Sequence, residues 1–331
     1  MRVLEIRNAH QGVFSGILML GEWGIERDSR AGKVLVCPDP VTTLYHKPRE
    51  RVVFWAERDA NPFFHFMEGL WMLAGRNDVA WLSRFNSRMK TFSDNGITFH
   101  GAYGYRWRKH FTNESAIGEV ITDQLPVIAK TLRENKDDRR CVLGIWDPRS
   151  DLGKKTKDVP CNLAVHFSVS VYGQLDMTVF NRSNDIIWGC YGANAVHFSM
   201  LQEVMAAWIG VEVGRYWQVS DNWHGYLDTL AKHKSVIDND QYYNPYEEDG
   251  FEPYPMVSVE IPIWFQDLHI FMDEGPIIGF REKFFRRVVT PMWHAWEAYK
   301  LKNIVQALEI IEQCEAKDWK KACQEWLRRR S

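Results

Sequence analysis

The sequence predicts an α+β protein in which long strands pack against helices. Apolar residues alternate with smaller or polar ones from 163 to 171 and again from 175 to 179, on either side of a Gly-containing turn. This pattern is typical of a β-hairpin. Between 195 and 209 the apolar spacing becomes that of a helix, and two further amphipathic stripes follow residue 288. Together these observations favour a sheet covered by helices, with a helical C-terminal segment.

Three further elements follow from the order of residues. The apolar run at 62–75 ends at Gly75, which predicts a buried helix. Residues 126–136 are expected to be helical, and residues 141–146 to form a short strand. The chain has 331 residues, of which 45% are apolar, so it can bury a full core.

The composition excludes several classes of partner. A formal net charge of −2 argues against a dedicated nucleic-acid or membrane surface, and no apolar run is long enough to span a bilayer. The six cysteines include no CxxC pair and no zinc-ligand spacing, so we expect reduced thiols and no metal site. The first residues lack the pattern of a signal peptide, and we therefore expect a cytoplasmic protein.

One cysteine stands in an unusual setting. Cys161 follows Pro160, which fixes the backbone entering the predicted strand. A lone cysteine is most simply a small buried hydrophobic residue, whereas a thiolate nucleophile requires a nearby cation. Because a hairpin returns its second strand beside its first, Arg182 could lie near Cys161, although a surface ion pair would also explain it. The polar residues 183–185 would ordinarily form a turn.

Several segments resemble the thymidylate synthase family, in its order and at nearly its spacing, over roughly residues 20–230. They are Arg30-Ala31-Gly32, Glu68 in EGLWMLAG, GAYGYRWR at 101–108, DDRRCVLGIWDP at 137–148, Pro160-Cys161, Arg182-Ser183-Asn184-Asp185, Asn194, and DNWHGY at 221–226. The resemblance implies a large mixed sheet packed with helices and a dimer formed through the sheet face. It also implies a catalytic domain over 1–287, with a helical extension over 288–331 packed on it.

The resemblance further implies covalent catalysis on a pyrimidine nucleoside monophosphate. Cys161 would add to carbon 6 and so make carbon 5 reactive toward a one-carbon unit carried by 5,10-methylenetetrahydrofolate. Glu68 would organise water and relay protons, and Tyr103 would assist proton transfer at carbon 5. A glutamate within an apolar helical run is costly without a partner, which independently favours a functional role for Glu68.

The implied binding residues divide by the part of the ligand that they contact. They are Arg30, Arg182 and Ser183 for the phosphate; Arg139 and Arg140 for the phosphate in the partner subunit of a homodimer; Asn194 for the base; His224 and Tyr226 for the sugar; and Asp185 and Gly189 for the folate. Simpler explanations stay open for three of these groups. The arginine pair could be solvated charges, Asn194 could cap a helix, and the His-x-Tyr motif could be packing.

The sequence departs from the family pattern at four places. Asn162 replaces the histidine after the cysteine, and the interval from Arg182 to Asn194 is one residue longer. Residues 87–99 lack the family's tryptophan-containing segment, and a helical extension replaces its short apolar tail. In the resembling family, hydride transfer requires an aromatic wall and a closed cavity, so the last two departures would let water reach the exocyclic methylene. They favour a 5-hydroxymethylase over a thymidylate synthase proper, which is the alternative. Asn194 favours dUMP over dCMP.

Two other classes of protein are alternatives to this enzyme. An inactive family member acting as a binding or assembly protein would be expected to lack the nucleophile or the phosphate arginines, and all of these are present. A cysteine hydrolase could pair Cys161 with His166 or His197, but no oxyanion-type glycine loop follows the cysteine.

Overall fold

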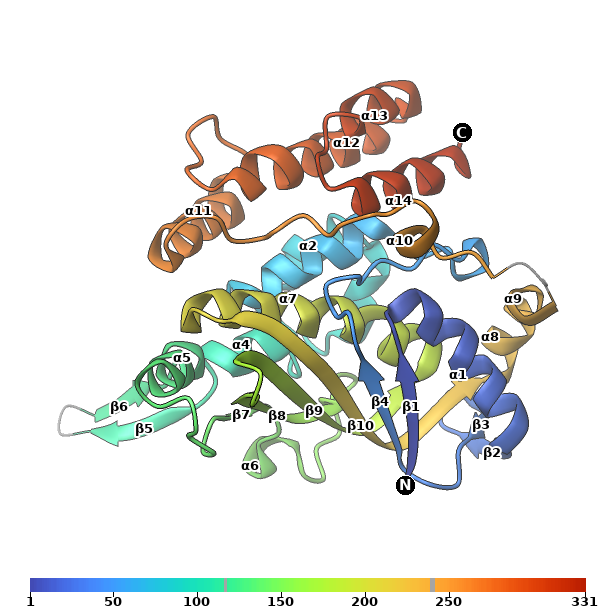
Figure 1. The fold of residues 1–331 in the computed structure, drawn as a ribbon, viewed down its shortest axis with the longest axis horizontal. Coiled ribbons are helices and arrows are strands. Elements are labelled where there is room, and N and C mark those ends of the chain that lie inside the picture. Colours follow the sequence, from blue (N-terminus) through green and yellow to red (C-terminus); the bar gives the residue numbers. More distant parts are fainter. Residues whose placement is uncertain (116–117, 239–241) are drawn as a thin grey trace.

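A mixed β-sheet forms the centre of the computed structural model, which describes residues 1–115, 118–238 and 242–331, and helices lie against one of its faces (Figure 1). The strand order is β1-β4-β10-β9-β8-β7, and the β2–β3 pair continues from β10. Strand β10 runs parallel to β9 and antiparallel to β4, whereas β8 runs antiparallel to both β7 and β9. The predicted α+β class is therefore confirmed.

The strands and helices have the following bounds. The strands are β1 (Arg2–Ile6), β2 (Ile25–Ser29), β3 (Gly32–Val36), β4 (Val41–Tyr45), β5 (Thr112–Ser115), β6 (Gly118–Ile121), β7 (Val142–Gly144), β8 (Asn162–Val169), β9 (Gln174–Asp185) and β10 (Glu212–Tyr226). The α-helices are α1 (Ala9–Trp23), α2 (Pro62–Leu73), α3 (Val79–Ser83), α4 (Tyr103–Arg108), α5 (Gln124–Glu134), α6 (Pro148–Asp151), α7 (Asn194–Ile209), α8 (Leu227–Lys232), α9 (Lys234–Asp238), α10 (Pro245–Glu248), α11 (Ile261–Glu274), α12 (Thr290–Lys300), α13 (Ile304–Ile311) and α14 (Lys317–Arg328). Short 3₁₀ turns are η1 (Ala56–Arg58) and η2 (Ser87–Phe92), and π-helical segments are η3 (Ile186–Ala193) and η4 (Phe285–Val289).

The predicted hairpin is strands β8 and β9. Val165 faces Val179 and Phe167 faces Met177 across the pair, and all four side chains are fully buried. This alternation explains the period of two in the sequence, because successive side chains of a strand point to opposite faces of the sheet. The hairpin turns at Gly173, whose φ of 75° lies in the region that favours glycine.

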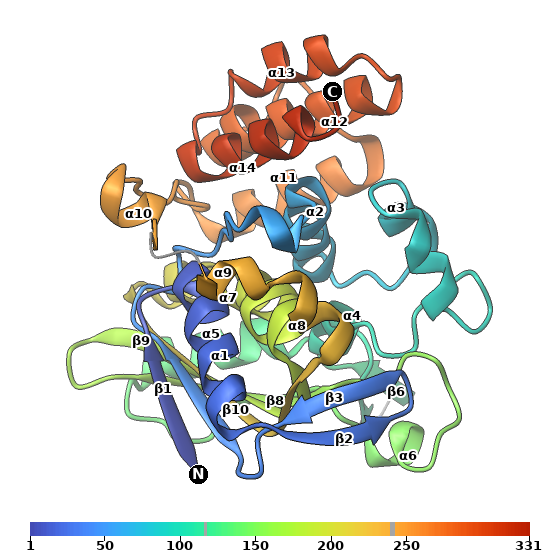
Figure 2. The same cartoon turned by 90° about the vertical axis from the view of Figure 1, so that its right-hand side faces the viewer.

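The helices form layers above the sheet. Helices α1 and α7 lie next to it, α2 lies over α7, and the C-terminal helices lie farthest from the strands (Figure 2). The predicted buried helix at 62–75 is α2, which Asn61 caps by accepting a hydrogen bond from the Phe64 N–H at 3.1 Å. Helices α2 and α7 approach closely at Gly69, because a Cβ there would lie 2.4 Å from the Met200 sulfur.

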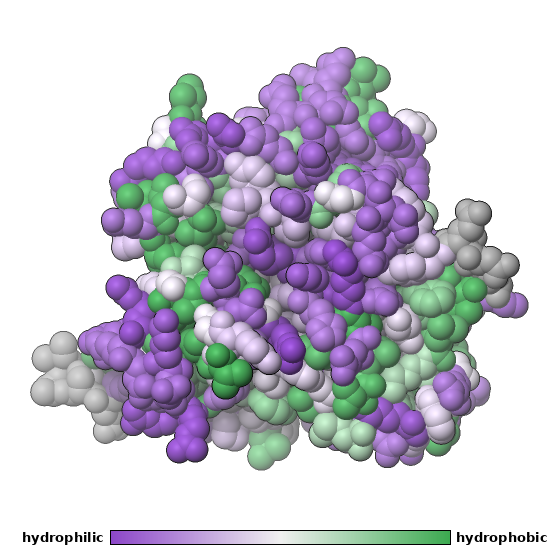
Figure 3. All heavy atoms as spheres, in the orientation of Figure 1, coloured by the Kyte–Doolittle hydropathy of each residue, from purple (hydrophilic) through white to green (hydrophobic). Residues whose placement is uncertain are grey.

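The chain after residue 288 is helical, as predicted, and its apolar stripes pack onto α2. The rings of Phe63 and Trp326 lie 5.8 Å apart, and those of Phe66 and Trp319 lie 5.1 Å apart. The outer side of these helices is mostly hydrophilic in Figure 3. Within the described ranges, the structure contains no helix that is both long and apolar enough to cross a membrane.

Candidate active site

Cys161 lies half-buried at the entrance to strand β8, beside an arginine. Its backbone N–H donates to the Tyr103 hydroxyl at 3.3 Å, and Arg182 Nη2 lies 3.7 Å from its Sγ. Arg182 also donates to the carbonyl oxygens of Pro160 at 2.8 Å and Val159 at 3.1 Å. The backbone that leads into the strand thus fixes the guanidinium next to the thiol.

The charge state of the thiol depends on two opposing effects. Burial raises the pKa of Cys161 above its ordinary value, and the nearby Asp158 raises it further, while Arg182 and Arg30 lower it. Arg182 lowers the pKa of Cys161, as expected for a nearby cation, but burial raises this pKa by more. Burial thus favours the neutral form of the Cys161 thiol.

A chain of buried amides orients Asn194. This residue is the first of α7, and its side chain makes no capping hydrogen bond, so the N-cap interpretation is wrong. Its Nδ2 instead donates to Asn184 Oδ1 at 3.1 Å. Asn184 Nδ2 in turn donates to Gln218 Oε1 at 2.8 Å and Ser220 Oγ at 3.0 Å. With this orientation, Asn194 keeps its Oδ1 and a second N–H for a ligand.

The one-residue-longer interval before Asn194 coincides with the π-helical segment η3. A π-helical turn holds one more residue than an α-helical turn, so it can absorb an insertion. Within η3, a Cβ on Gly189 would lie 2.7 Å from Asn184 Oδ1 and 3.5 Å from Asn194 Nδ2. Gly189, for which we expected a folate contact, thus packs directly on the amide pair. The residues 183–185 belong to strand β9, so the alternative of a turn is wrong.

Asp185 ends strand β9 with one of its oxygens unpaired. Its Oδ1 accepts hydrogen bonds from the backbone N–H groups of Ile187 at 2.8 Å and Trp188 at 2.6 Å. Its Oδ2 is buried and finds no hydrogen-bond partner among the described residues. Burial raises the pKa of this carboxyl group, which the backbone N–H groups and His224 partly oppose. Nearby, the Arg58 guanidinium lies 4.1 Å from the centroid of the exposed Trp188 ring.

The expected sugar-binding residues lie at the same end of the sheet. His224 pairs with Asp185 in the parallel register of β10 and β9, and Ser183 pairs with Asn222 two residues earlier. The rings of His224 and Tyr226 lie 5.5 Å apart in an edge-to-face arrangement. The structure therefore gathers Ser183, Asp185, His224 and Tyr226 near the carboxyl ends of two neighbouring strands.

The remaining predicted arginines are exposed. Arg30 lies in the turn between β2 and β3, and β3 pairs with the end of β10, where Val34 faces Tyr226. Arg139 and Arg140 precede β7, and Arg140 Nη2 donates to Asp138 Oδ2 at 2.6 Å. All three guanidinium groups are thus accessible to an anion or to a second chain.

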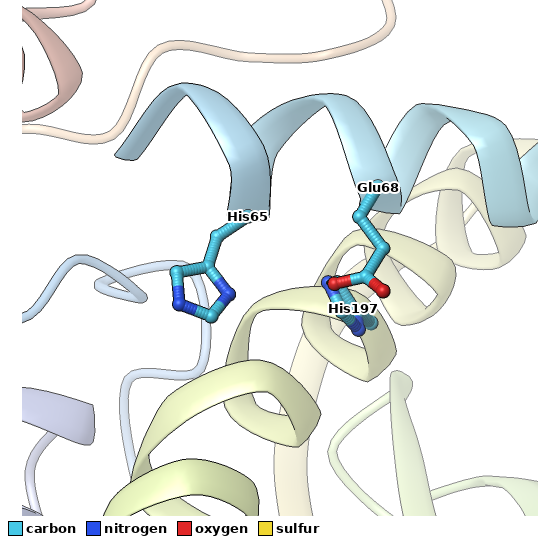
Figure 4. A group of neighbouring side chains, drawn as sticks. All are labelled: His65, Glu68 and His197. Carbon is cyan, nitrogen blue, oxygen red and sulfur yellow. The ribbon is translucent and has the colours of Figure 1, made fainter. Parts of the chain in front are cut away.

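Glu68, predicted to be a catalytic residue, lies between α2 and α7 in a cluster with two histidines, for which the sequence predicted no such grouping. His65 and Glu68 stand one turn apart on α2, and Glu68 Oε2 lies 3.1 Å from His197 Nε2 on α7 (Figure 4). One nitrogen of each imidazole and one oxygen of Glu68 all lie within 4.8 Å of one another. The spacing of three residues between His65 and Glu68 could have indicated this cluster, because such residues share a helix face.

The position of the histidines also bears on the hydrolase alternative. His166 lies five residues beyond Cys161 along strand β8, which corresponds to about 16 Å at the rise of an extended strand. His197 contacts Glu68. Neither arrangement pairs an imidazole with the Cys161 thiol, so the structure does not support a cysteine–histidine hydrolase.

A small cavity lies beside His65. Its wall includes His65 and Arg58 from the α2 region and Tyr191 from η3. Helix α14 contributes Trp319 and Arg329 to the same wall, so the C-terminal extension covers one side of the cavity.

Comparison with known proteins identifies the family. The family model described as thymidylate synthase matches residues 49–248. The chain is 49% identical to a deoxyuridylate hydroxymethyltransferase of Pseudomonas phage M6 over 341 aligned positions, covering all of this chain and 95% of that protein. It is 44% identical to a protein of the same name from Bacillus phage SP01, over 57% of this chain and 50% of the relative. A thymidylate synthase of Corynebacterium aurimucosum is 28% identical over 61% of this chain and 80% of its own length. With its cysteine, arginine and amide cluster at the ends of the central strands, the chain belongs to the thymidylate synthase family.

Proposed function

We propose that this protein is a deoxyuridylate 5-hydroxymethyltransferase, which places a hydroxymethyl group on carbon 5 of dUMP. The observation that carries this proposal is the 49% identity, over the whole chain, to a relative of that name. The thymidylate synthase from Corynebacterium is less similar and aligns with a smaller part of the chain. The extension after residue 288 is thus part of the alignment with the phage protein.

The base is proposed to be uracil because of the orientation of Asn194. With one N–H committed to Asn184, its Oδ1 can accept the N3–H of uracil and its second N–H can donate to the 4-oxygen. Cytosine presents an unprotonated ring nitrogen and an amino group at these positions. Two acceptors would then face each other, and so would two donors. An amide fixed by buried hydrogen bonds cannot turn over cheaply to accommodate cytosine.

Cys161 is proposed to add to carbon 6 of the base. Arg182 stabilises the thiolate from 3.7 Å, and the gain of this charge interaction opposes the burial that keeps the free thiol neutral. Burial also raises the pKa of Tyr103, so its hydroxyl remains a neutral hydrogen-bond donor beside the reacting atoms. Arg30, Arg182 and Ser183 are proposed to bind the phosphate through charge-assisted hydrogen bonds.

The proposed co-substrate is 5,10-methylenetetrahydrofolate, which supplies a one-carbon unit at the oxidation level of formaldehyde. The buried, unpaired Oδ2 of Asp185 fits this group, because a pterin ring offers N–H donors to a carboxylate. The exposed Trp188, three residues after Asp185, provides an aromatic surface. The folate ring is therefore proposed to lie against Asp185, near Gly189.

We further propose a homodimer formed through the sheet face opposite α7. On that face, alternate positions of the strands leave large apolar side chains exposed, including Val3, Val142 and Phe180. Such a dimer would allow Arg139 and Arg140 to reach the phosphate of the partner subunit. The cytoplasm is the proposed location, since a catalytic thiol must stay reduced.

The test is a comparison of products. The protein is incubated with dUMP, dCMP or CMP and methylenetetrahydrofolate, and the nucleotide is analysed by mass spectrometry. We expect 5-hydroxymethyl-dUMP without formation of dihydrofolate, which only reductive methyl transfer produces. Thymidylate together with dihydrofolate would instead establish the alternative, a thymidylate synthase proper. No conversion of any nucleotide would favour an inactive binding or assembly protein.

A further inference from the structure

The C-terminal end of the chain is tied to a turn beside the candidate active site. Asp59 Oδ1 accepts hydrogen bonds from Arg329 Nε at 3.2 Å and from Arg330 Nη1 at 3.0 Å, and its Oδ2 accepts one from Arg330 Nη2 at 2.6 Å. The Arg330 guanidinium also lies 3.7 Å from the centroid of the Trp326 ring, and its Nη1 donates to the Trp326 carbonyl oxygen at 3.1 Å. Helix α14 thus holds Arg330 in the position from which it contacts Asp59.

The backbone at Asp59 depends on these contacts. Its φ of 41° is left-handed, and this conformation, which is unfavourable for a residue other than glycine, ends the turn η1. Although burial raises the pKa of Asp59, the two arginines lower it overall, so the carboxylate is ionised at neutral pH. Because both of its oxygens are occupied by the C-terminal arginines, neither is left for the neighbouring Arg58.

Arg58 is buried without a carboxylate partner. Its side chain is 7% exposed, and within the described part of the chain it makes no ion pair. Its Nε donates to the Ile187 carbonyl oxygen at 3.0 Å, and its guanidinium lies 4.1 Å from the centroid of the Trp188 ring. Burial lowers the pKa of Arg58 to about 10, so the side chain remains a cation at neutral pH.

Arg58 contacts the same short turn that orients Asp185. The N–H groups of Ile187 and Trp188 donate to Asp185 Oδ1, while the carbonyl oxygen of Ile187 and the ring of Trp188 contact Arg58. On the next turn of η3, a Cβ on Gly192 would lie 3.4 Å from Arg58 Nη2. The guanidinium covers part of the Trp188 ring, of which 51% of the residue stays exposed for a ligand.

We propose that the C-terminal arginine pair, Arg329 and Arg330, positions the wall against which the folate co-substrate binds. By holding Asp59, the pair keeps Arg58 against Trp188 and so fixes the turn that follows strand β9. This inference deepens the proposed function and depends on it. It gives the extension after residue 288 a part in co-substrate binding, through residues that do not themselves touch the folate.

The charges show what the arginine pair prevents. Without it, Asp59 would be an unpaired carboxylate next to the buried and unpaired cation of Arg58, and the two would attract each other. A turn released from its left-handed conformation could bring them together. Arg58 would then leave Trp188, whose side chain would gain rotamers that must be lost again when a ligand binds.

The experiment separates co-substrate binding from the rest of the reaction. The test variant carries both Arg329→Ala and Arg330→Ala, and Arg330→Lys is the conservative change. Arg328→Ala is the matched control, because Arg328 is exposed on the same last turn of α14. Arg58→Gln interrupts the same path one step closer to the site.

Two kinds of measurement are made on the full chain. The KM for methylenetetrahydrofolate and kcat come from the rate of product formation, and the Kd of dUMP comes from calorimetry. Hydrogen exchange of the Ile187 and Trp188 amides is followed in the ligand-free protein, so that this measurement does not require activity.

We expect the KM for methylenetetrahydrofolate to rise about tenfold in the double variant, which corresponds to about 1.4 kcal/mol. The value of kcat should stay within about twofold, the Kd of dUMP should be unchanged, and the Ile187 and Trp188 amides should exchange faster. Arg330→Lys should recover part of the affinity, and Arg328→Ala should match the wild type. Adding Arg58→Gln to the double variant should raise KM little further, because the path is already broken.

Other outcomes overturn the inference. An unchanged KM in the double variant, or a fully additive effect of Arg58→Gln, would show that the arginine pair does not act through Arg58. Parallel losses of kcat, dUMP affinity and melting temperature would assign the pair a general structural role. A wild-type protein that makes no product would refute the proposed function itself. Faster exchange of the two amides in the double variant would then still support the link to the C-terminus, and unchanged exchange would refute it.

Discussion

Gly189 provides a sharp test of the amide chain that orients Asn194. In Gly189→Ala, the new Cβ would lie 2.7 Å from Asn184 Oδ1, whereas ordinary contacts begin near 3.4 Å. The amide must therefore move by about 0.7 Å. It cannot do so freely, because its Nδ2 is bonded to Gln218 and Ser220 at 2.8 and 3.0 Å. The movement should break the 3.1 Å hydrogen bond from Asn194.

The expected magnitude follows from the bonds that are lost. A buried neutral hydrogen bond contributes about 1 kcal/mol, and an unpaired buried partner adds about 1 kcal/mol more. We expect the free energy of unfolding to fall by about 1–2 kcal/mol, measured by urea denaturation. A misoriented Asn194 should also weaken uracil binding by about 1.4 kcal/mol, which is a tenfold rise in the Kd of dUMP measured by calorimetry.

Two comparisons make this prediction refutable. Gly21→Ala is the matched control, because Gly21 lies within helix α1 and its Cβ would meet nothing within 4 Å. It should leave dUMP binding unchanged and raise stability slightly, since alanine is the better helix former. In Asn184→Ala, which removes the clashing oxygen, adding Gly189→Ala should cost little more. Fully additive losses in the double variant, or wild-type dUMP affinity in Gly189→Ala, would show that this contact does not orient Asn194.

Three further predictions test the nucleophile, the base and the buried ion pair. Cys161→Ser should reduce kcat at least about 1,000-fold while dUMP affinity changes little in calorimetry; an equal loss of affinity would contradict its role as nucleophile. Asn194→Asp should shift the ratio of kcat/KM from dUMP toward dCMP, and an unchanged ratio would mean that another residue reads the base. Arg106 and Asp151 are fully buried 2.6 Å apart, so Asp151→Asn should lower the free energy of unfolding by about 3–5 kcal/mol at pH 7. Burial alone would raise the pKa of Asp151, but hydrogen bonds from Arg106 and other groups lower this pKa overall. The ionised Asp151 therefore stabilises the wild type above about pH 4, and this stabilisation should be lost as the pH falls further. The Asp151→Asn variant should not show this loss.

The fold could be predicted from the sequence where one face of an element is buried. The alternation that predicted β8 and β9 is the alternation of buried Val165, Phe167, Met177 and Val179. The parallel pairing of β9 with β10 could not be predicted from the residues themselves, because their partners lie about 40 residues apart and nothing local fixes their register. Strand β9 extends beyond the predicted alternation at 175–179, because its last residues are polar and do not continue that pattern.

The candidate site was predictable only in part. Residues with a motif of their own, such as Cys161 and Arg182, were named from the sequence, and the structure places them in contact. Asn184 and His65 were not assigned roles, and His197 was considered only as a possible partner of Cys161 in a hydrolase, because their contacts are with side chains on other elements. Asn184 joins Asn194 of α7 to β10, and His197 meets Glu68 because α2 approaches α7 at Gly69. Contacts between distant elements of this kind leave no local period in a sequence.

Methyl and hydroxymethyl transfer share every step up to the exocyclic methylene, so the product depends on which nucleophile reaches that carbon first. Hydride transfer requires a dry and closed site. In this chain, the segment 87–99 that replaces the family's tryptophan region begins with the turn Ser87–Phe92, which has no buried residues. Helix α14 occupies part of the wall of the cavity that His65 also lines. An open wall would let water reach the exocyclic methylene before hydride could be transferred. On the proposed mechanism, the exposed turn and the helical extension therefore act on the same step, because each replaces part of the closed wall that hydride transfer requires.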